Sequence, residues 1–252
     1  MAITISFGLQ KGGVGKTTST AITSFILSKD SKVLAIDLDG QGNLTEMLSS
    51  QHQIEIQNTV YNVIENESVD ACIYQLTDKL DLIPANYDIS KLSNLVTFDK
   101  SKQRLHRLKN ALTEVQDQYD YILIDLPPAL GEQTLFGLIA SDYTVSLLQT
   151  DPFALRALDD YLTLCKEVNE EHNSDLRLLG ILAVLLNARA AMDQAILTKV
   201  KEDFGELVFE NVVKRRARIK EYAAAGVTDH TKADKIALEE YEGFVKELVE
   251  RV

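Results

Sequence analysis

A turn rich in glycine and lysine near the start of the chain has the residue types that bind phosphate. Its residues are Lys11, Gly12, Gly13, Val14, Gly15, Lys16, Thr17 and Thr18. Glycines let backbone amides curl around an anion, and the first turn of a following helix adds unpaired N–H donors and a positive dipole end. A lysine at the end of such a loop reaches the terminal phosphates of a nucleotide, and the next hydroxyl joins a Mg²⁺ shell. Lys16 and Thr17 stand at those two positions.

The elements on either side of the turn can position it in this way. Residues 3–9 form a β-branched and aromatic run typical of a buried strand, and residues 17–29 repeat apolar side chains at helical spacing. The spacing departs from the common G-x-x-x-x-G-K-[ST] pattern, because the residue five before Gly15 is Gln10. The first glycine of the pattern is therefore Gly8 or is displaced, and Lys11 stands where a small residue is usual.

Aspartates end two further apolar runs. Residues 32–39 end in Asp37 and Asp39, and residues 119–126 contain Asp125 before two prolines. Ligands of doubly wound sheets collect at the carboxyl ends of the strands, so these carboxylates are expected beside the phosphate loop. Asp125 has the position to hold Mg²⁺ next to Thr17, whereas Asp37 either faces the same crevice or caps the next helix.

The order of the predicted elements indicates an α/β fold with a doubly wound, mostly parallel sheet and helices on both faces. Beyond the runs above, strands are predicted at 80–84, 144–149 and 178–186, and helices at 89–98, 104–115, 153–169 and 232–252. No linker rich in Pro, Gly or Ser and no internal repeat divides the chain. We therefore expect a single domain over residues 1–252.

Composition and charge exclude several classes of protein. The 252 residues carry a net charge of −12, which counts against a protein that coats nucleic acid over its whole surface. No run approaches the roughly 18 apolar residues of a membrane span, and the first strand begins at once without a leader, so we expect a cytoplasmic protein. Cys72 and Cys165 lack the spacing of a zinc site or a disulfide framework and are expected to be packing residues.

Two late stretches have opposite charge. The first is the basic segment, residues 214–220, whose cations are Lys214, Arg215, Arg216, Arg218 and Lys220. Such a cluster can grip phosphates with salt-sensitive affinity, or it can be a solvated face that neutralises the protein's own acidic surface. The second stretch, residues 232–252, has one broad apolar face and a net acidic polar face, so we expect it to pack onto the sheet rather than onto anionic lipid.

Asn187 follows the strand predicted at 178–186, at the edge of the sheet where a nucleotide base could be held. A GTPase with a phosphate-binding loop of this kind is expected to carry N-K-x-D or T-K-x-D there to recognise guanine. Residues 187–190 are N-A-R-A instead, which favours ATP over GTP as the ligand. Asn187 itself is either a base contact or a helix cap.

The loop K-G-G-V-G-K-T-T resembles the deviant Walker A loop of the ParA/MinD family of dimeric ATPases. The sequence D-L-D-G-Q-G-N resembles switch I of that family, with Gly40 in place of the usual proline, and D-Y-I-L-I-D-L-P-P-A-L-G resembles its switch II. The resemblance covers most of the chain. It is nearest to the ParA-type partition ATPases that lack an N-terminal DNA-binding extension.

For the site, the resemblance implies that two ATP molecules are sandwiched between two subunits of a homodimer. Lys11 would cross the two-fold axis to the phosphates bound by the other subunit, while Lys16 holds those of its own subunit. Asp39 would position the attacking water, which makes Lys11, Lys16 and Asp39 the expected catalytic residues. Thr17 and Asp125 would hold the metal, so the expected cofactors are ATP and Mg²⁺.

For partners, the resemblance implies nonspecific DNA and a ParB-like centromere-binding protein that speeds hydrolysis. DNA would bind to the ATP dimer through Lys214, Arg215, Arg216 and Arg218, although Lys214 replaces the proline that is usual there. Asn187 would contact adenine. We expect from this an ATP-hydrolysing switch for plasmid or chromosome partition, cytoplasmic and nucleoid-associated in its ATP state.

Three alternatives stay open on the sequence alone. A MinD-like ATPase that cycles on membranes shares the site but needs a cationic C-terminal helix, which residues 232–252 do not supply. An electron-transferring relative of the nitrogenase iron protein needs cluster-ligating cysteines, and two distant cysteines do not make such a set. The third alternative is a nucleotide-gated regulatory module that hardly turns over and acts on another protein.

Overall fold

One mostly parallel sheet organises the protein. Its strands are β1 (Ile3–Gly8), β2 (Val33–Asp37), β3 (Tyr74–Gln75), β4 (Leu80–Ile83), β5 (Tyr121–Asp125), β6 (Tyr143–Gln149), β7 (Arg177–Leu186) and β8 (Val213–Lys214). The computed structural model describes residues 1–92, 102–150, 153–186 and 191–252. In these residues the strand order is β3-β4-β2-β5-β1-β6-β7-β8. Neighbouring strands are parallel except for the antiparallel pair of β3 and β4.

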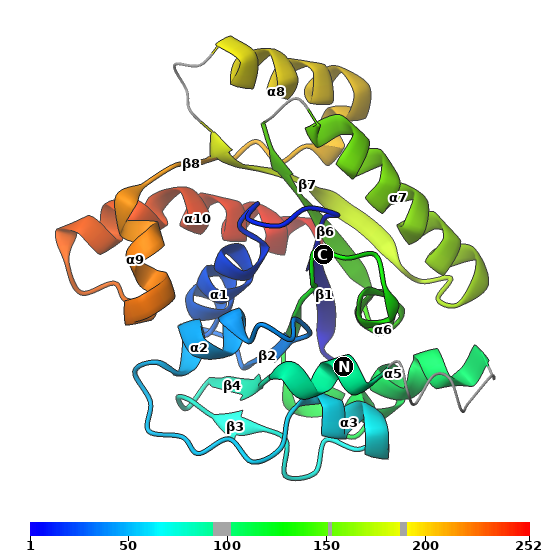
Figure 1. The fold of residues 1–252 in the computed structure, drawn as a ribbon. Helices are drawn as coiled ribbons and strands as arrows, with labels where there is room; N and C mark the ends of the chain where they lie inside the picture. Colours follow the sequence, from blue (N-terminus) through cyan, green and yellow to red (C-terminus); the bar gives the residue numbers. More distant parts are fainter. Residues whose placement is uncertain (93–101, 151–152, 187–190) are drawn as a thin grey trace.

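Helices cover both faces of this sheet. They are α1 (Lys16–Leu27), α2 (Asn43–Ser49), α3 (Val60–Asn66), α5 (Arg107–Leu112), α6 (Glu132–Ile139), α7 (Ala154–Glu171), α8 (Ala191–Phe204), α9 (Ala217–Ala225) and α10 (Lys232–Arg251). Short 3₁₀ turns cover Tyr87–Lys91, Lys102–His106, Gln116–Gln118 and Gly205–Leu207. Figure 1 shows α1, α2, α9 and α10 on one side of the sheet and α5, α6 and α7 on the other. The predicted doubly wound α/β fold is therefore confirmed.

The strand order decides where the functional residues meet. β5 lies between β2 and β1, and its last residue, Asp125, is in register with Asp37 on one side and with Phe7 on the other. The loop after β1 therefore leaves the sheet beside the acidic ends of β2 and β5. This is the topological arrangement in which ligands bind at the carboxyl edge of an α/β sheet.

The structure has a strand at each of the predicted strands and a helix at the positions expected for 17–29, 153–169 and 232–252, whereas the two-residue strands β3 and β8 were not predicted. The continuous helix predicted at 104–115 is wrong, because a 3₁₀ turn precedes α5 and α5 ends at Leu112. The Thr113 hydroxyl bonds to the Asn110 carbonyl at 2.6 Å, and the Thr113 amide also bonds to that carbonyl, so the chain tightens and leaves the helix there. Much of the helix predicted at 89–98 falls outside the described residues.

The C-terminal helix α10 packs on the sheet through its apolar face, as the sequence predicts. The Phe244 ring meets Phe7 edge-on at a centroid distance of 6.5 Å and Phe209 at 4.8 Å. The Tyr241 hydroxyl lies 3.0 Å from the Ser19 hydroxyl of α1, in a fully buried contact. In the described part of the chain, no helix combines the length and the apolarity needed to cross a membrane.

Candidate functional site

The loop between β1 and α1 is open where a phosphate would enter it. Gly13 and Gly15 adopt φ angles of +73° and +86°, a left-handed conformation that side chains rarely tolerate. Ideal Cβ atoms built on Gly12, Gly13 and Gly15 meet no atom within 4 Å, so these three glycines border open space. Gly8 differs, because its Cβ would collide with the buried Tyr161 ring. It is therefore a packing glycine of β1, and the first glycine of the common pattern is displaced.

Lys16 is buried at the start of α1, and its side chain points back across the loop. Its Nζ donates a 2.8 Å hydrogen bond to the carbonyl oxygen of Lys11. Burial lowers the pKa of Lys16, and the nearby carboxylates of Asp125 and Asp39 oppose this shift. The two loop lysines predicted to act in catalysis are thus in direct contact, although the contact uses the backbone of Lys11 rather than its ammonium group.

Asp125 sits at the end of β5 with its side chain fully buried. Its Oδ2 accepts a 2.6 Å hydrogen bond from the Thr17 hydroxyl, and its Oδ1 accepts one of 3.3 Å from the Thr20 hydroxyl. The structure therefore brings Thr17 and Asp125 together, as expected for a metal site. Thr20 was not foreseen, but it lies one helical turn after Lys16, and that spacing places it on the same face of α1.

Asp37 and Asp39 separate into two roles. Asp37 is fully buried, and its carboxylate accepts the backbone amides of Asp39 at 3.0 Å and of Thr45 at 2.9 Å. Since Thr45 lies in the first turn of α2, Asp37 caps that helix, which was the simpler of its two interpretations. Asp39 lies at the surface of the cavity, and its Oδ1 accepts the amide of Gln41 at 3.0 Å.

The site carries more buried negative charge than its own cation neutralises. Burial raises the pKa of Asp37 to about 6, against the opposing hydrogen bonds from Thr45. Burial, and then the charge of Asp37, raise the pKa of Asp125 well above its ordinary value. A divalent cation would neutralise this buried negative charge. Mg²⁺ prefers hard oxygen ligands such as the carboxylate of Asp125 and the hydroxyl of Thr17. The residues present therefore fit a Mg²⁺ site.

Mg²⁺ usually takes one or two protein oxygens and completes its shell with water and phosphate oxygens. Among the described residues, no three His, Cys, Asp or Glu side chains gather into a metal-binding group.

A cavity of about 600 Å³ opens beside the loop. Its walls come from the loop (Gly12, Gly13, Val14, Gly15, Lys16, Thr17, Thr18), from the segment after β2 (Asp39, Gln41, Asn43, Glu46, Met47) and from the later part of the chain (Pro128, Val184, Val213, Ile219, Lys220, Ala223, Tyr241). The volume lies in the range of small-ligand and cofactor sites. The walls from β7, β8 and α9 are mostly apolar, as a site for a flat base requires. Asn187, the predicted adenine contact, lies outside the described residues.

The basic segment does not present its cations equally. Glu240 of α10, which is only 12% exposed, pairs with Lys214 Nζ at 3.0 Å and with Arg216 at 2.8 Å. Arg218 pairs with Asp234 and Glu221, each at 2.6 Å. Arg215 and Lys220 are exposed, and neither has a hydrogen-bond or ion-pair partner in the described part of the chain.

The sequence missed several residues that shape the site. Ile219, Lys220 and Ala223 line the cavity from α9, a helix that was not predicted. The run A-R-I-K-E-Y-A-A-A has strong helix formers, but its charge pattern indicates a contact with nucleic acid rather than packing. The partnership of Arg218 with Asp234 joins residues 16 apart and leaves no periodic signal.

Comparisons with known proteins agree with this geometry. A family model described as an AAA domain matches residues 2–178. The chain is 32% identical over 255 residues to the chromosome-partitioning ATPase Soj of Treponema pallidum, which covers 100% of this chain and 98% of that protein. It is 33% identical over 220 residues to the chromosome partitioning protein ParA of Myxococcus xanthus, which covers 86% of this chain and 77% of that protein.

A solved structure gives the same result for the fold and for the class of ligand. Cobyrinic acid a,c-diamide synthase from Mycobacterium smegmatis, with bound ADP and magnesium, matches with a TM-score of 0.77 at 29% identity, over 96% of this chain and 97% of that chain. Its ligands are of the kind expected here, an adenine nucleotide with Mg²⁺. The family model spans more than half of the chain, and the two relatives exceed 30% identity over most of it. The predicted family is thereby confirmed, and this chain belongs to the AAA domain family of Soj- and ParA-type ATPases.

Proposed function

We propose that this chain is the ATP-hydrolysing switch of a DNA-partition system, with residues 1–252 acting as one ATPase domain. The observation that carries the proposal is the 2.6 Å contact of Thr17 with Asp125 beside an open glycine loop that contains two lysines. The relatives named for chromosome partitioning support the biological role.

The residues of the site have separate tasks in hydrolysis. The open amides of the loop bind the phosphates, and Lys16 moves its ammonium group from the Lys11 carbonyl to the phosphate oxygens. Thr17 and Asp125 would hold Mg²⁺, and the ion would supply positive charge beside the phosphates. Asp39, held by Asp37 and Gln41 on the rim of the cavity, orients the attacking water.

We further infer that two copies associate when ATP is bound and that Lys11 reaches the phosphates of the partner. Two large apolar side chains support association at this edge of the sheet. Phe153 is 74% exposed just before α7, and Met192 is 59% exposed near the start of α8. Both helices begin after the carboxyl ends of strands, on the same edge as the loop. Burying these side chains between two copies would remove apolar area from water, which favours association.

DNA is the proposed target of the ATP-bound dimer. The protein is acidic overall, and the basic segment is a local region in which DNA phosphates can be held. Arg215 and Lys220 are the cations best placed to act, because the others are paired within the chain. A ParB-like protein at a centromere site would stimulate hydrolysis and release the dimer. Nucleoid association would follow from DNA binding.

The test is binding to nonspecific duplex DNA with ATP, with ADP and without nucleotide, at two salt concentrations. We expect binding only with ATP, weaker at higher salt, and weakened in the variant Arg215→Ala, whose side chain is outside the cavity lining. Lys166→Ala, which removes an exposed cation of α7, is the matched control and should bind as the wild type does. ATP-dependent dimerisation without DNA binding in any state would reject DNA as the target and favour a protein partner.

A further inference from the structure

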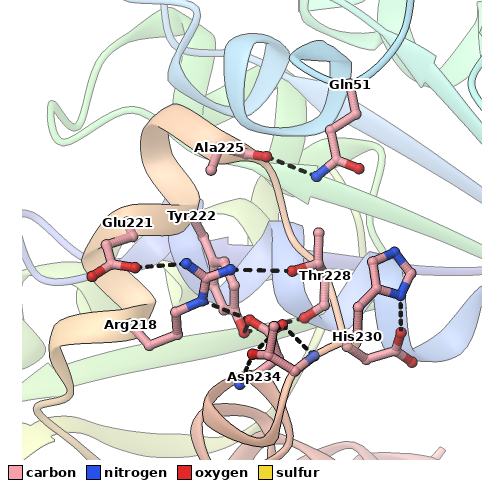
Figure 2. Close-up of polar contacts among 10 residues, drawn as sticks. Gln51, Arg218, Glu221, Tyr222, Ala225, Thr228, His230 and Asp234 are labelled. Carbon is pink, nitrogen blue, oxygen red and sulfur yellow. Dashed lines mark hydrogen bonds and ion pairs between the residues drawn. The ribbon is translucent and has the colours of Figure 1, made fainter.

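Helix α9 has two faces with different neighbours. One face carries Ile219, Lys220 and Ala223, which line the cavity beside the phosphate-binding loop. The other face carries Arg218 and Tyr222, which are one turn apart and both contact α10 (Figure 2). Arg218 and Tyr222 are four apart and share one side of the helix, and the cavity-lining residues lie on the adjacent side of the same short helix. A shift of α9 on α10 therefore moves a wall of the cavity.

Asp234 receives the second face of α9. Its side chain is fully buried at the start of α10, where its Oδ1 accepts the Arg218 Nε at 2.6 Å and lies 3.1 Å from the Tyr222 hydroxyl. Its Oδ2 accepts the amide and the hydroxyl of Thr231, at 2.9 and 2.7 Å. Burial alone would raise the pKa of Asp234, but the hydrogen bonds from Arg218 and Thr231 outweigh it and hold this pKa below its ordinary value.

Each of the three nitrogens of the Arg218 guanidinium donates a hydrogen bond in this network. Beyond Asp234, it donates to Glu221 at 2.6 Å and to the Thr228 hydroxyl at 3.4 Å, and it lies 5.3 Å from the centre of the Tyr222 ring. A guanidinium that binds a buried carboxylate in this way is costly to remove, because the carboxylate stays behind without its cation. The pair therefore fixes where α9 sits.

The far end of α9 is fixed as well. The Gln51 side chain, just after α2, donates a 2.7 Å hydrogen bond to the carbonyl of Ala225 (Figure 2). The next residue, Gly226, has φ of +76°, and a Cβ there would lie 2.8 Å from Gln51 Nε2. Because α2 also lines the cavity, α9 is held between two elements that both contact the ligand space.

We propose that Asp234 is a positioning residue of the nucleotide pocket, because through Arg218 and Tyr222 it holds the cavity wall of α9 in the geometry that binds nucleotide. The inference rests on the proposed function, since that function makes the ligand of the cavity a nucleotide. It also gives Arg218 a task inside the protein, whereas its sequence context suggests a contact with DNA. Asp234 and Arg218 act as one unit in this role.

The experiment measures the affinity for a fluorescent ATP analogue and the steady-state hydrolysis of ATP by the full chain. Asp234→Asn and Arg218→Gln should each weaken binding by roughly tenfold, in the range of energetic coupling between neighbouring sites. KM should rise while kcat stays unchanged, because Asp39 and Asp125 are not displaced. The double variant should be no weaker than either single variant, because both remove the same interaction.

Controls separate positioning from general destabilisation. Glu221→Gln removes an Arg218 contact that does not reach α10, and it should keep the affinity of the wild type. Tyr222→Phe removes one hydroxyl and keeps the ring, so it should give a smaller loss in a protein that folds. If Asp234→Asn does not fold, Arg218→Gln and Tyr222→Phe carry the test. All affinities are measured well below the melting temperature of each variant, determined by circular dichroism.

The outcomes distinguish this inference from the proposed function. A wild type that binds no ATP would reject the proposed function itself. The inference alone would be overturned if the wild type binds ATP and the folded Asp234→Asn and Arg218→Gln variants bind it with the affinity of the wild type. It would also be overturned if Arg218→Gln kept its ATP affinity and lost DNA binding while Asp234→Asn kept both, because Arg218 would then belong to the DNA contact.

Discussion

Oδ2 of Asp37 accepts two hydrogen bonds from Thr45, one from its amide at 2.9 Å and one from its hydroxyl at 2.8 Å. The same hydroxyl accepts the amide of Ala85 at 2.9 Å. One threonine thus joins the ends of β2 and β4 to the start of α2. Asp37 also accepts the amide of Asp39, so the hydrogen bonds of Thr45 help to position Asp39, the proposed hydrolytic residue.

Thr45→Val should therefore weaken both the fold and hydrolysis. The substitution leaves the Ala85 amide without its acceptor and a buried carboxylate with one donor fewer, which costs about 2 kcal/mol of unfolding free energy. ATP affinity should change little, while kcat falls because Asp39 is less well held. Urea denaturation and steady-state kinetics check this, with Thr45→Ser as the control that keeps the hydroxyl. An unchanged kcat in Thr45→Val would contradict the link to Asp39.

Asp125→Asn should make the nucleotide-free protein more stable at neutral pH. Burial, and then the charge of Asp37, raise the pKa of Asp125, so the folded chain holds a proton there that the unfolded chain releases. Above the unfolded pKa, Asp125 therefore lowers the free energy of unfolding of the wild type. This loss decreases as the pH falls toward the unfolded pKa, because the folded protein then holds a proton that the unfolded chain also takes up. The stability difference between Asp125→Asn and the wild type should shrink as the pH falls from neutral toward the unfolded pKa of an aspartate.

The measurement is urea denaturation of both proteins across this pH range without Mg²⁺. Comparing the two proteins matters because burial lowers the pKa of His106, which titrates in the same range with the opposite effect on stability. That contribution is common to both and cancels. A variant less stable than the wild type at every pH would show that Asp125 is not under electrostatic strain. Asp125→Asn should also lose Mg²⁺-dependent hydrolysis.

Lys16 and Asp39 should separate binding from chemistry. Lys16→Ala removes the ammonium group that meets the phosphates, so ATP binding should be lost. Asp39→Ala removes only the group that orients water, so ATP should still bind while hydrolysis falls by about a hundredfold or more. Equilibrium binding and single-turnover hydrolysis check the pair. Intact hydrolysis in Asp39→Ala would remove Asp39 from the catalytic residues.

Glu240→Gln tests how the basic segment is controlled. The glutamate neutralises Lys214 and Arg216, so its removal releases two cations toward solvent. If the segment binds DNA, affinity at low salt should rise, and the slope of log affinity against log salt should steepen by up to about 2. Filter binding or fluorescence anisotropy over a salt series measures the slope. Weaker binding would show instead that the pairs with Glu240 shape the DNA surface.

Local sequence patterns were sufficient for the parts of the protein that local chemistry specifies. The loop around Lys16 and the strand ending in Asp125 could be predicted, because a glycine turn between strand and helix and an apolar run ending in aspartate are specified over a few residues. The contact of Thr17 with Asp125 followed from the rule that parallel strands bring their carboxyl ends together. The helices α2, α3, α6, α8 and α9 were not predicted, and the short ones among them owe their stability to tertiary packing rather than to their own periodicity.

The basic segment shows why the remaining roles could not be predicted. Arg218 and Arg215 have the same chemistry and stand three residues apart, yet one is bound to a buried carboxylate and the other is exposed. The difference lies in Asp234, which the fold brings close only because α10 returns beside α9. A charge pattern counts cations but does not show which of them the protein has already neutralised. The DNA-binding roles of Lys214, Arg215, Arg216 and Arg218 stay predictions.

The two outer strands of the sheet, β3 and β8, are each two residues long. A strand this short offers few unpaired amides, so another molecule cannot readily extend the sheet by adding a strand of its own. The short outer strands therefore disfavour the stable edge-to-edge strand pairing between copies that long exposed strands permit. The proposed association of two copies would then depend on side chains and on a shared ligand, and such a contact can end when the ligand is consumed.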